Sequence, residues 1–249
     1  MRLFNRFKKK EVLPPIDLSS FKVDMHSHLI PGIDDGSQSM DETIAMLAKF
    51  ESFGYKKVIT TPHIMSDFYR NTPEIIVRGL EKVKQTAKKL NLEIEIEAAA
   101  EYYFDETLLE KLEKKEKLMT FGDNYVLFEF SFHVEPPQID KLLFELLSQG
   151  YKPVLAHFER YMFLLNTPEK ARKWREMGIN IQMNFNSLGG HYGPEIQKQA
   201  EWLVDNKQID FVSTDCHRMD HLLILEKNLV NPYFHKLLEL DLKNGDLLR

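Results

Sequence analysis

The chain has only one cysteine, Cys216, among its 249 residues, and it has no long apolar run. A single thiol cannot form an intramolecular disulfide or a cysteine-based zinc cluster, so neither can stabilise this protein. No apolar stretch approaches the roughly 18 residues that cross a membrane. The first ten residues carry basic side chains but lack the apolar segment of a secretory signal. We therefore expect a cytoplasmic protein.

An excess of positive charge is also missing, because 33 Lys and Arg face 38 Asp and Glu, for a net charge of −5. Without a basic surplus we expect no nucleic-acid partner. With 43% hydrophobic and 29% charged residues, the composition is typical of a globular protein that buries a large core. The length fits one α/β barrel as well as it fits two smaller domains.

Short apolar runs alternate with segments whose apolar residues recur at helical spacing, as at Met40, Ile44 and Leu47. The runs of strand length lie around Val23 and at 57–61, 92–98, 125–130, 153–157, 179–184 and 209–215. This alternation predicts βαβ units and a parallel sheet. Seven such strands favour a barrel, or a barrel-like sheet, over an open sheet with a separate domain.

Side chains that can bind a metal close six of the seven predicted strands. Five of the nine histidines and three carboxylates lie there: His26, His28, His63, Glu101, Glu129, His157, Asp215 and His217. Because the carboxyl ends of parallel barrel strands meet on one face, we expect these side chains to share one cleft. Carboxylates this dense repel one another unless cations neutralise them, so the sequence predicts a metal site.

The loop after the first strand adds two further carboxylates, Asp34 and Asp35, which precede Gly36. An Asp–Gly pair is also typical of a plain turn. Either carboxylate could nonetheless fold back over the site of His26 and His28. The other four histidines do not lie at strand ends, and we expect no metal-binding role for them: His133, His191, His221 and His235.

These residues together resemble a known family. The segments that carry the resemblance are 24–28, 34–36, 61–63, 100–103, 128–131, 156–160 and 214–217. They resemble the polymerase-and-histidinol-phosphatase (PHP) superfamily, and within it the bacterial manganese-dependent protein-tyrosine phosphatases of capsule and exopolysaccharide loci, the CpsB/YwqE type. The likeness runs from Phe21 to at least His217 and implies a distorted (β/α)7, TIM-like barrel of the α/β class.

The resemblance also implies three metal ions, Mn²⁺ in this family, with nine ligands. One ion would be held by His26, His28, Glu101 and Asp215. Glu101 would bridge to a second ion, held by Glu129 and His157, and the third would be held by Asp35, His63 and His217. Histidine and carboxylate ligands also suit iron, zinc or cobalt, and magnesium is a further alternative.

Arg160 lies three residues after His157 and matches the family's phosphate-binding arginine. A second arginine usually follows the family's Asp-x-His motif by a few residues, and Arg218 is the candidate for that role from a shifted position. The resemblance implies that a metal-activated hydroxide hydrolyses phosphotyrosine on a protein. That protein would be a bacterial tyrosine kinase that controls capsule or exopolysaccharide synthesis.

Other functions stay open at this point. Another PHP phosphoesterase would act on a small ester such as histidinol phosphate, or on nucleic-acid ends. A binuclear amidohydrolase fits less well, because Glu129 and Asn184 stand where a bridging lysine and a histidine are typical. A non-catalytic module that binds a phosphorylated kinase tail is the alternative from another class, and it is disfavoured by the intact Arg160 and ligand set.

A cysteine-dependent phosphatase is excluded by the sequence around Cys216. Such enzymes need an arginine six positions after the cysteine, to bind phosphate and lower the thiol pKa, and here that residue is Leu222. In an extended segment, the Cys216 side chain would point away from those of Asp215 and His217. We therefore expect Cys216 to lie in the barrel wall.

Residues 1–20 are interpreted as a basic, solvated tail before a phosphatase domain at 21–249, since five of the first ten residues are Lys or Arg. The alternative is weak contact with anionic lipid, with Leu3, Phe4 and Phe7 beside the cations. Because the first predicted strand and the first ligand lie beyond residue 20, the sequence alone predicts that deletion of 1–20 leaves turnover intact.

Overall fold

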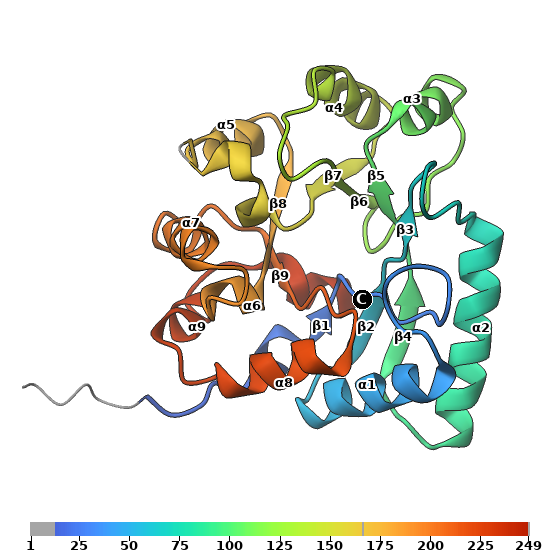
Figure 1. Ribbon diagram of the computed structural model, residues 1–249, viewed down its shortest axis with the longest axis vertical. Helices are drawn as coiled ribbons and strands as arrows, with labels where there is room; N and C mark the ends of the chain where they lie inside the picture. Colours follow the sequence, from blue (N-terminus) through green and yellow to red (C-terminus); the bar gives the residue numbers. More distant parts are fainter. Residues whose placement is uncertain (1–12, 166, 249) are drawn as a thin grey trace, which may run out of the picture.

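The computed structural model describes residues 13–165 and 167–248. Within these residues, parallel strands lie inside a ring of helices (Figure 1). The strands are β1 (Val23–Asp24), β2 (Lys57–Thr60), β3 (His63–Ile64), β4 (Glu95–Ala98), β5 (Glu101–Tyr103), β6 (Tyr125–Glu129), β7 (Lys152–Leu155), β8 (Asn180–Asn184) and β9 (Phe211–Ser213).

The strands form two sheets, of order β1-β2-β4 and β3-β5-β6-β7-β8-β9. Only Thr61 and Pro62 separate β2 from β3, and only Ala99 and Ala100 separate β4 from β5, so each of these pairs forms one interrupted barrel strand. The structure differs from the expected runs at 57–61 and 92–98 in that each barrel strand resumes after the interruption, as β3 and β5. Counted this way, the protein is a distorted (β/α)7 barrel, as expected.

The barrel closes between β1 and the segment that follows β9. The Asp24 carboxylate accepts hydrogen bonds from the Thr214 backbone N–H at 2.8 Å and the Thr214 hydroxyl at 3.2 Å. The His28 backbone N–H donates to the Cys216 carbonyl at 2.8 Å. Burial raises the pKa of Asp24 to about 7, against these hydrogen bonds, which favour the ionised form.

The helices cover the outside of the barrel (Figure 1). They are α1 (Met40–Ser52), α2 (Pro73–Lys89), α3 (Glu106–Glu113), α4 (Ile139–Ser148), α5 (Lys170–Glu176), α6 (Phe185–Leu188), α7 (Pro194–Asp205), α8 (Met219–Lys227) and α9 (Pro232–Leu237). Four 3₁₀ helices accompany them: η1 (Leu18–Phe21), η2 (Phe158–Arg160), η3 (Met162–Leu164) and η4 (Lys243–Leu248).

Local sequence signals account for several helix ends. Ser39 and Thr72 begin α1 and α2, because their hydroxyls accept hydrogen bonds from the free backbone N–H groups of the first turn. Gly54 and Gly150 follow α1 and α4 with φ of 85° and 80°, the left-handed conformation that ends a helix and favours glycine.

Apolar side chains fill the amino-terminal part of the barrel interior. They are Val23, Met25, Ile59, Ala99, Phe121, Leu127, Val154, Ala156, Phe211 and Leu247. Leu247 belongs to η4, whose backbone carbonyl at this residue accepts a hydrogen bond from the Lys57 ammonium at 2.9 Å. A second, larger apolar cluster lies between the strands and the helices. The polar side chains are left to the opposite, carboxyl-terminal end of the strands.

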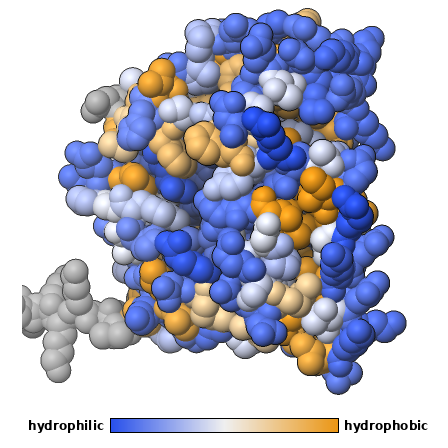
Figure 2. Space-filling model, turned by 45° about the vertical axis from the view of Figure 1, so that its right-hand side comes forward, coloured by the Kyte–Doolittle hydropathy of each residue, from blue (hydrophilic) through white to orange (hydrophobic). Residues whose placement is uncertain are grey.

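The outer surface is mainly hydrophilic on the face seen in Figure 2, with apolar residues in separate patches. Among the residues that the structure describes, no helix combines the length and the apolar character needed to cross a bilayer.

The packed part of the chain begins earlier than the sequence suggested. Ile16 and Leu18 are only 6% and 2% exposed and belong to the large apolar cluster. The Ile16 backbone N–H donates to the Leu229 carbonyl at 2.9 Å. The tail expected to extend to residue 20 therefore ends before Ile16, because two apolar side chains of this segment enter the core. The basic cluster and its expected lipid contact lie outside the described residues.

We predict that Leu18→Ala lowers the free energy of unfolding by about 2–5 kcal/mol, because it leaves a cavity in the core. Leu90→Ala is the matched control, since Leu90 is 56% exposed and its loss should cost about 0.5 kcal/mol or less. Urea denaturation measures both. Deletion of residues 1–20 should likewise destabilise the protein, because it removes Ile16 and Leu18 from the core. Unchanged stability of this truncation would contradict the boundary.

Candidate active site

Glu101, the first residue of β5, lies at the centre of the polar cluster and is fully buried. Its Oε2 lies 3.2 Å from His26 Nε2, 3.4 Å from His28 Nε2 and 3.2 Å from His63 Nδ1. Its Oε1 lies 3.1 Å from His157 Nε2. One carboxylate thus contacts an imidazole of β3 and imidazoles that directly follow β1 and β7, which is how the barrel unites residues far apart in sequence.

Asp215 completes the group proposed for the first ion. Its Oδ1 lies 3.4 Å from His26 Nε2 and 3.6 Å from His28 Nε2. The backbone of Asp215 has φ of 51°, and that of His157 has φ of 34°. Left-handed conformations at residues other than glycine cost about 1–3 kcal/mol each and persist where the surrounding structure holds them.

The second expected group, Glu101, Glu129 and His157, is also brought together, with His157 Nε2 3.6 Å from Glu129 Oε2. His63 Nδ1 lies closer to this group than the resemblance implied, at 3.1 Å from Glu129 Oε1. His63 therefore stands between the second and third expected groups, with one ring nitrogen facing each.

The third expected group contains Asp35, whose Oδ1 lies 3.4 Å from His63 Nε2 and 3.5 Å from His217 Nε2. Gly36 lets this loop fold back, because a Cβ there would lie 2.3 Å from His28 Cβ. The chain thus turns at this Asp–Gly pair, and the turn places the Asp35 carboxylate beside His63 and His217. Asp34 takes a different role, since its Oδ2 accepts a hydrogen bond from His28 Nδ1 at 2.8 Å.

In three histidines, Nδ1 donates a hydrogen bond, and this leaves Nε2 facing the carboxylates. His26 Nδ1 donates to Gln182 Oε1 at 3.2 Å, and His217 Nδ1 donates to the Asp215 carbonyl at 3.0 Å. His28 does the same with Asp34. Such partners fix the tautomer and ring orientation of metal-binding histidines in proteins.

The donor atoms fit divalent metal ions. His26 Nε2 and His28 Nε2 lie 3.3 Å apart, so a proton or a metal ion must lie between their lone pairs. Glu101 Oε2, His63 Nδ1 and His157 Nδ1 are buried and have no hydrogen-bond partner among the described residues. Seven of the nine expected ligands belong to three overlapping groups, and within each group the possible ligand atoms all lie within 4.8 Å of one another. Orphaned buried atoms of this kind are otherwise costly.

Burial and charge have opposite effects on the ionisable groups of the cluster. Burial favours the neutral form of Glu101, but His26 and His63 lower the pKa of this carboxyl well below its usual value. Burial also disfavours charged His28, yet Asp34 raises the pKa of this imidazole to about 10. The neighbouring carboxylates therefore favour the protonated imidazole of His28, the neighbouring imidazoles favour the ionised form of Glu101, and a metal ion competes with protons for the same imidazole nitrogens.

A cavity of about 500 Å³ opens onto the cluster. Its lining includes seven of the nine expected ligands, while His26 and His28 lie beneath it, against Glu101 and Asp215. Arg160 enters from η2, and its Nη1 donates to Asp215 Oδ2 at 3.1 Å. Arg218 lines the rim at the start of α8 and is exposed.

Three histidines that were not expected at the site also line the cavity: His133, His191 and His221. None of them belongs to a group of ligand atoms, and His221 Nδ1 lies 3.2 Å from the Asp215 carbonyl oxygen. His235 lies elsewhere, with its Nε2 donating to the Pro14 carbonyl. That these four are not ligands stays a prediction. The sequence had left open that His133, four residues after Glu129, lines the cleft, whereas the nearness of His191 and His221 was not foreseen.

Sequence reasoning missed Gln182 and Asn184, two buried residues of β8. Gln182 Oε1 accepts from the His157 backbone N–H at 2.7 Å as well as from His26. Asn184 Nδ2 donates to Asp215 Oδ2 at 2.8 Å. A signal was present, since polar residues occupy every second position of the buried segment Asn180–Asn184, which places them on one face of a strand.

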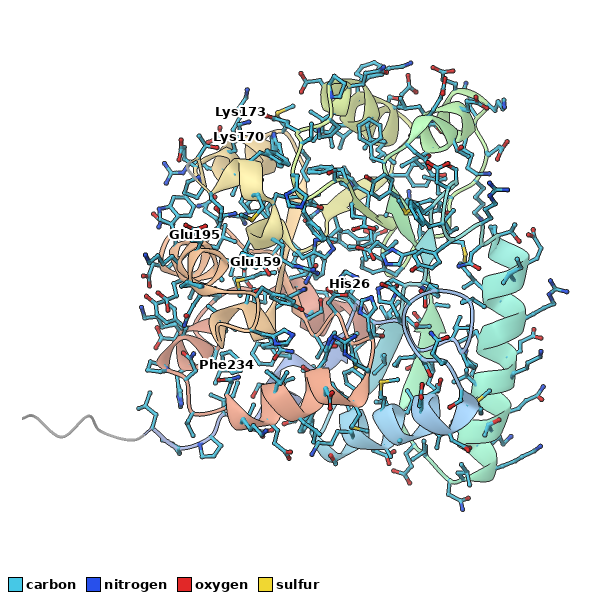
Figure 3. The ribbon with its side chains drawn as sticks, in the orientation of Figure 1. His26, Glu159, Lys170, Lys173, Glu195 and Phe234 are labelled. Carbon is cyan, nitrogen blue, oxygen red and sulfur yellow. The ribbon has the colours of Figure 1, made fainter. Side chains whose placement is uncertain are left out.

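The labelled residues of Figure 3 show that the site and the surface charges lie in different parts of the molecule. His26 lies within the ring of strands, whereas Lys170, Lys173 and Glu195 lie on the outer helices α5 and α7. The charged residues of the site are thus separated from the surface charges by the strands and by the apolar layer between strands and helices.

The family model for capsular polysaccharide synthesis proteins, CpsB/CapC, matches residues 22–222 of this chain. A tyrosine-protein phosphatase CpsB of Streptococcus pneumoniae is 32% identical over 204 residues, which cover 80% of this chain and 84% of that protein. The chain belongs to the CpsB/CapC family. A second relative in this family, tyrosine-protein phosphatase YwqE of Bacillus subtilis, is 26% identical over 91% of each chain.

Solved structures agree with this membership. A structure from the work on YwqE of Bacillus subtilis and CpsB of Streptococcus pneumoniae, described as metal-dependent tyrosine phosphatases, matches with a TM-score of 0.77 and 26% identity. It covers 91% of this chain and 94% of that chain. An amidohydrolase of Mycoplasma synoviae matches with a TM-score of 0.58 at 12% identity, which shows a shared fold. The CpsB/CapC proteins thus share the barrel with distant hydrolases.

Cys216 lies in the wall of the barrel, as expected. Its side chain is fully buried in the large apolar cluster, and its Sγ lies 3.6 Å from Met46 Sδ. Burial raises the pKa of this thiol well above its usual value. A buried, protonated thiol is a poor nucleophile.

We predict that Gln182→Leu weakens metal binding about 10- to 100-fold, because His26 then loses the acceptor that orients its ring. Gln208→Leu is the matched control, since Gln208 is also buried but donates to the Asn206 carbonyl. Calorimetric titration of metal-free protein measures both affinities. An unchanged affinity in Gln182→Leu would show that the ring needs no such support.

We also predict that Cys216→Ser keeps most phosphatase activity, since a serine hydroxyl fits the same space and can donate to the Arg218 carbonyl. Asp215→Ala should remove most activity through loss of a ligand. Turnover of an aryl phosphate compares the two variants. The reverse ranking would indicate a thiol mechanism.

Proposed function

We propose that this CpsB/CapC-family protein is a metal-dependent protein tyrosine phosphatase. The observation that carries the proposal is the convergence of nine histidine, aspartate and glutamate side chains with Arg160 at one cavity. The names of the relatives from Streptococcus pneumoniae and Bacillus subtilis support phosphotyrosine as the substrate class.

Three ions, with Mn²⁺ as the proposed metal, would be held by the three groups described above. His26, His28, Glu101 and Asp215 would hold the first; Glu101, Glu129 and His157 the second; and Asp35, His63 and His217 the third. When bound, such ions hold a phosphate ester, lower the pKa of a water molecule that attacks phosphorus, and stabilise the transferred charge.

The remaining chemistry belongs to the protein's own side chains. The Arg160 guanidinium binds phosphate oxygens, which it can do with two parallel charge-assisted hydrogen bonds. Arg218 at the rim supplies a second positive charge in the cavity. The phenol of tyrosine, with a pKa near 10, leaves more readily than an alkyl alcohol, so less help from a general acid is needed.

The proposed substrate is a phosphotyrosine protein, specifically a bacterial tyrosine kinase that controls capsule or exopolysaccharide synthesis, and the proposed location is the cytoplasm. The family model, which describes capsular polysaccharide synthesis proteins, supports this choice. Small phosphate esters and nucleic-acid ends are the alternative substrates that an experiment has to separate.

A substrate panel on protein of defined metal content tests the proposal. We expect turnover of a phosphotyrosine peptide with Mn²⁺, abolition by a chelator and recovery on adding Mn²⁺. A phosphoserine peptide, histidinol phosphate and short DNA should be hydrolysed more slowly. Full activity of protein shown by elemental analysis to hold no metal would overturn the metal mechanism, and preference for histidinol phosphate would overturn the substrate.

We predict that Arg160→Ala lowers kcat/KM about 10²- to 10³-fold, roughly 3–4 kcal/mol, with metal content unchanged, because a charge that stabilises the transition state is lost. Arg78→Ala on α2 serves as the control, since Arg78 is exposed and lies outside the cavity. Steady-state kinetics on an aryl phosphate measures the effect. A loss below threefold would mean that the metals alone bind the phosphate.

A further inference from the structure

The guanidinium of Arg160 lies against two aromatic rings. Its Cζ lies 4.4 Å from the ring centroid of Phe132 and 4.4 Å from that of Tyr192. A guanidinium has five N–H donors in one plane. Within the described part of the chain, one of these has an acceptor, Asp215 Oδ2. The other donors remain available at a side chain that is 23% exposed and lines the cavity.

Phe132 is held in place by a backbone hydrogen bond and by contacts of its ring. Phe132 lies in the loop after β6, and its carbonyl accepts a hydrogen bond from the Met162 N–H at 2.7 Å. Its ring also lies 5.1 Å from that of His157 and 5.7 Å from that of Tyr161. The loop that carries Phe132 is therefore tied to the segment that follows Arg160.

Tyr192 lies in a glycine-rich loop, residues 189–193. A Cβ at Gly189 would lie 2.5 Å from the side chain of Asn228, so this loop packs closer than another residue would permit. Gly190 and Gly193 have φ of 77° and 102°, in the region that favours glycine. The close packing at Gly189 and the backbone conformations of Gly190 and Gly193 thus place the Tyr192 ring against the Arg160 guanidinium.

Glu159 joins the arginine segment to the strand and helix that precede this loop. It is fully buried, and its Oε1 accepts hydrogen bonds from the Asn184 N–H at 3.0 Å and from the Ser187 hydroxyl. Figure 3 shows Glu159 to one side of His26, toward α7. Glu159, the residue before Arg160, thus connects the arginine to the segment that leads to Tyr192.

We propose that Phe132 and Tyr192 are positioning residues that hold the plane of the Arg160 guanidinium, so that its free N–H groups meet the phosphate oxygens. The inference rests on the proposed function, because phosphate is the ligand assumed. Cation–π contact with two rings opposes rotation of the long side chain. A donor that is already ordered loses less conformational entropy when phosphate binds.

A different role for the two rings is direct contact with the tyrosyl ring of the substrate. Inorganic phosphate separates the roles, because it has no ring. A residue that acts through Arg160 changes the affinity for phosphate, whereas a residue that contacts only the tyrosyl ring changes KM for a peptide and leaves the affinity for phosphate unchanged.

The experiment measures binding of inorganic phosphate to Mn²⁺-loaded protein by calorimetry. We expect Tyr192→Leu and Phe132→Leu each to weaken binding about 2- to 30-fold, with metal content and unfolding midpoint reported alongside. Tyr192→Phe and Phe132→Tyr should recover most of the loss, since they keep the ring. Tyr233→Leu is the matched control, because Lys236 Nζ lies 4.0 Å from that ring outside the cavity.

A double-mutant cycle tests whether the rings act through the arginine. In an Arg160→Lys background, which keeps the charge but loses the planar group, Tyr192→Leu should have less than a twofold further effect. The same loss in both backgrounds, or unchanged phosphate affinity in the single variants, would overturn the inference. Turnover of a phosphotyrosine peptide by the unaltered protein is measured separately, so failure of the proposed function is recognised independently of the phosphate comparison.

Discussion

The buried carboxylate of Glu101 is the constraint on which the rest of the site depends. It lies within 3.4 Å of four imidazoles, which lie in β3 or directly after β1 and β7. A carboxylate in the barrel interior is stable only with positive charge beside it, supplied by protons on those imidazoles or by metal ions. Asp215 is buried in the same cluster, and His26 and His217 lower its pKa well below the usual value, against the effect of burial. The need for cations is therefore a property of the fold itself.

The barrel supports this cluster by dividing its interior into an apolar and a polar part. The apolar residues and η4 occupy the amino-terminal end, so the interior needs no water there. At the other end, Gln182 and Asn184 of β8 hydrogen-bond to the residues expected to bind metal. The left-handed backbone at His157 and Asp215 is held by hydrogen bonds to distant segments, because the His157 N–H donates to Gln182 Oε1 and the Asp215 N–H donates to the His26 carbonyl. Unfavourable local conformations are thus compensated by long-range packing.

Phosphate recognition depends on a second layer of contacts around Arg160. The carboxylate of Asp215 contacts both the His26 imidazole and the Arg160 guanidinium, through different oxygens. The metal group and the phosphate-binding group are therefore connected by one residue. The loops after β6 and α6 then place the rings of Phe132 and Tyr192 against the guanidinium. In the proposed function, phosphate binding would therefore depend also on side chains that do not themselves contact the phosphate.

The sequence by itself determined the fold class and the residues gathered at the site. Alternating apolar runs and helical spacing predicted the parallel barrel, and the polar residue at each strand end predicted the cleft, because a parallel barrel brings those ends together. Only the tertiary structure decided the packing of Ile16 and Leu18 into the core, the breaks between β2 and β3 and between β4 and β5, the position of His63 between two groups, and the placement of Tyr192 over Arg160. These features depend on contacts between distant segments, and local periodicity carries no information about which segments meet.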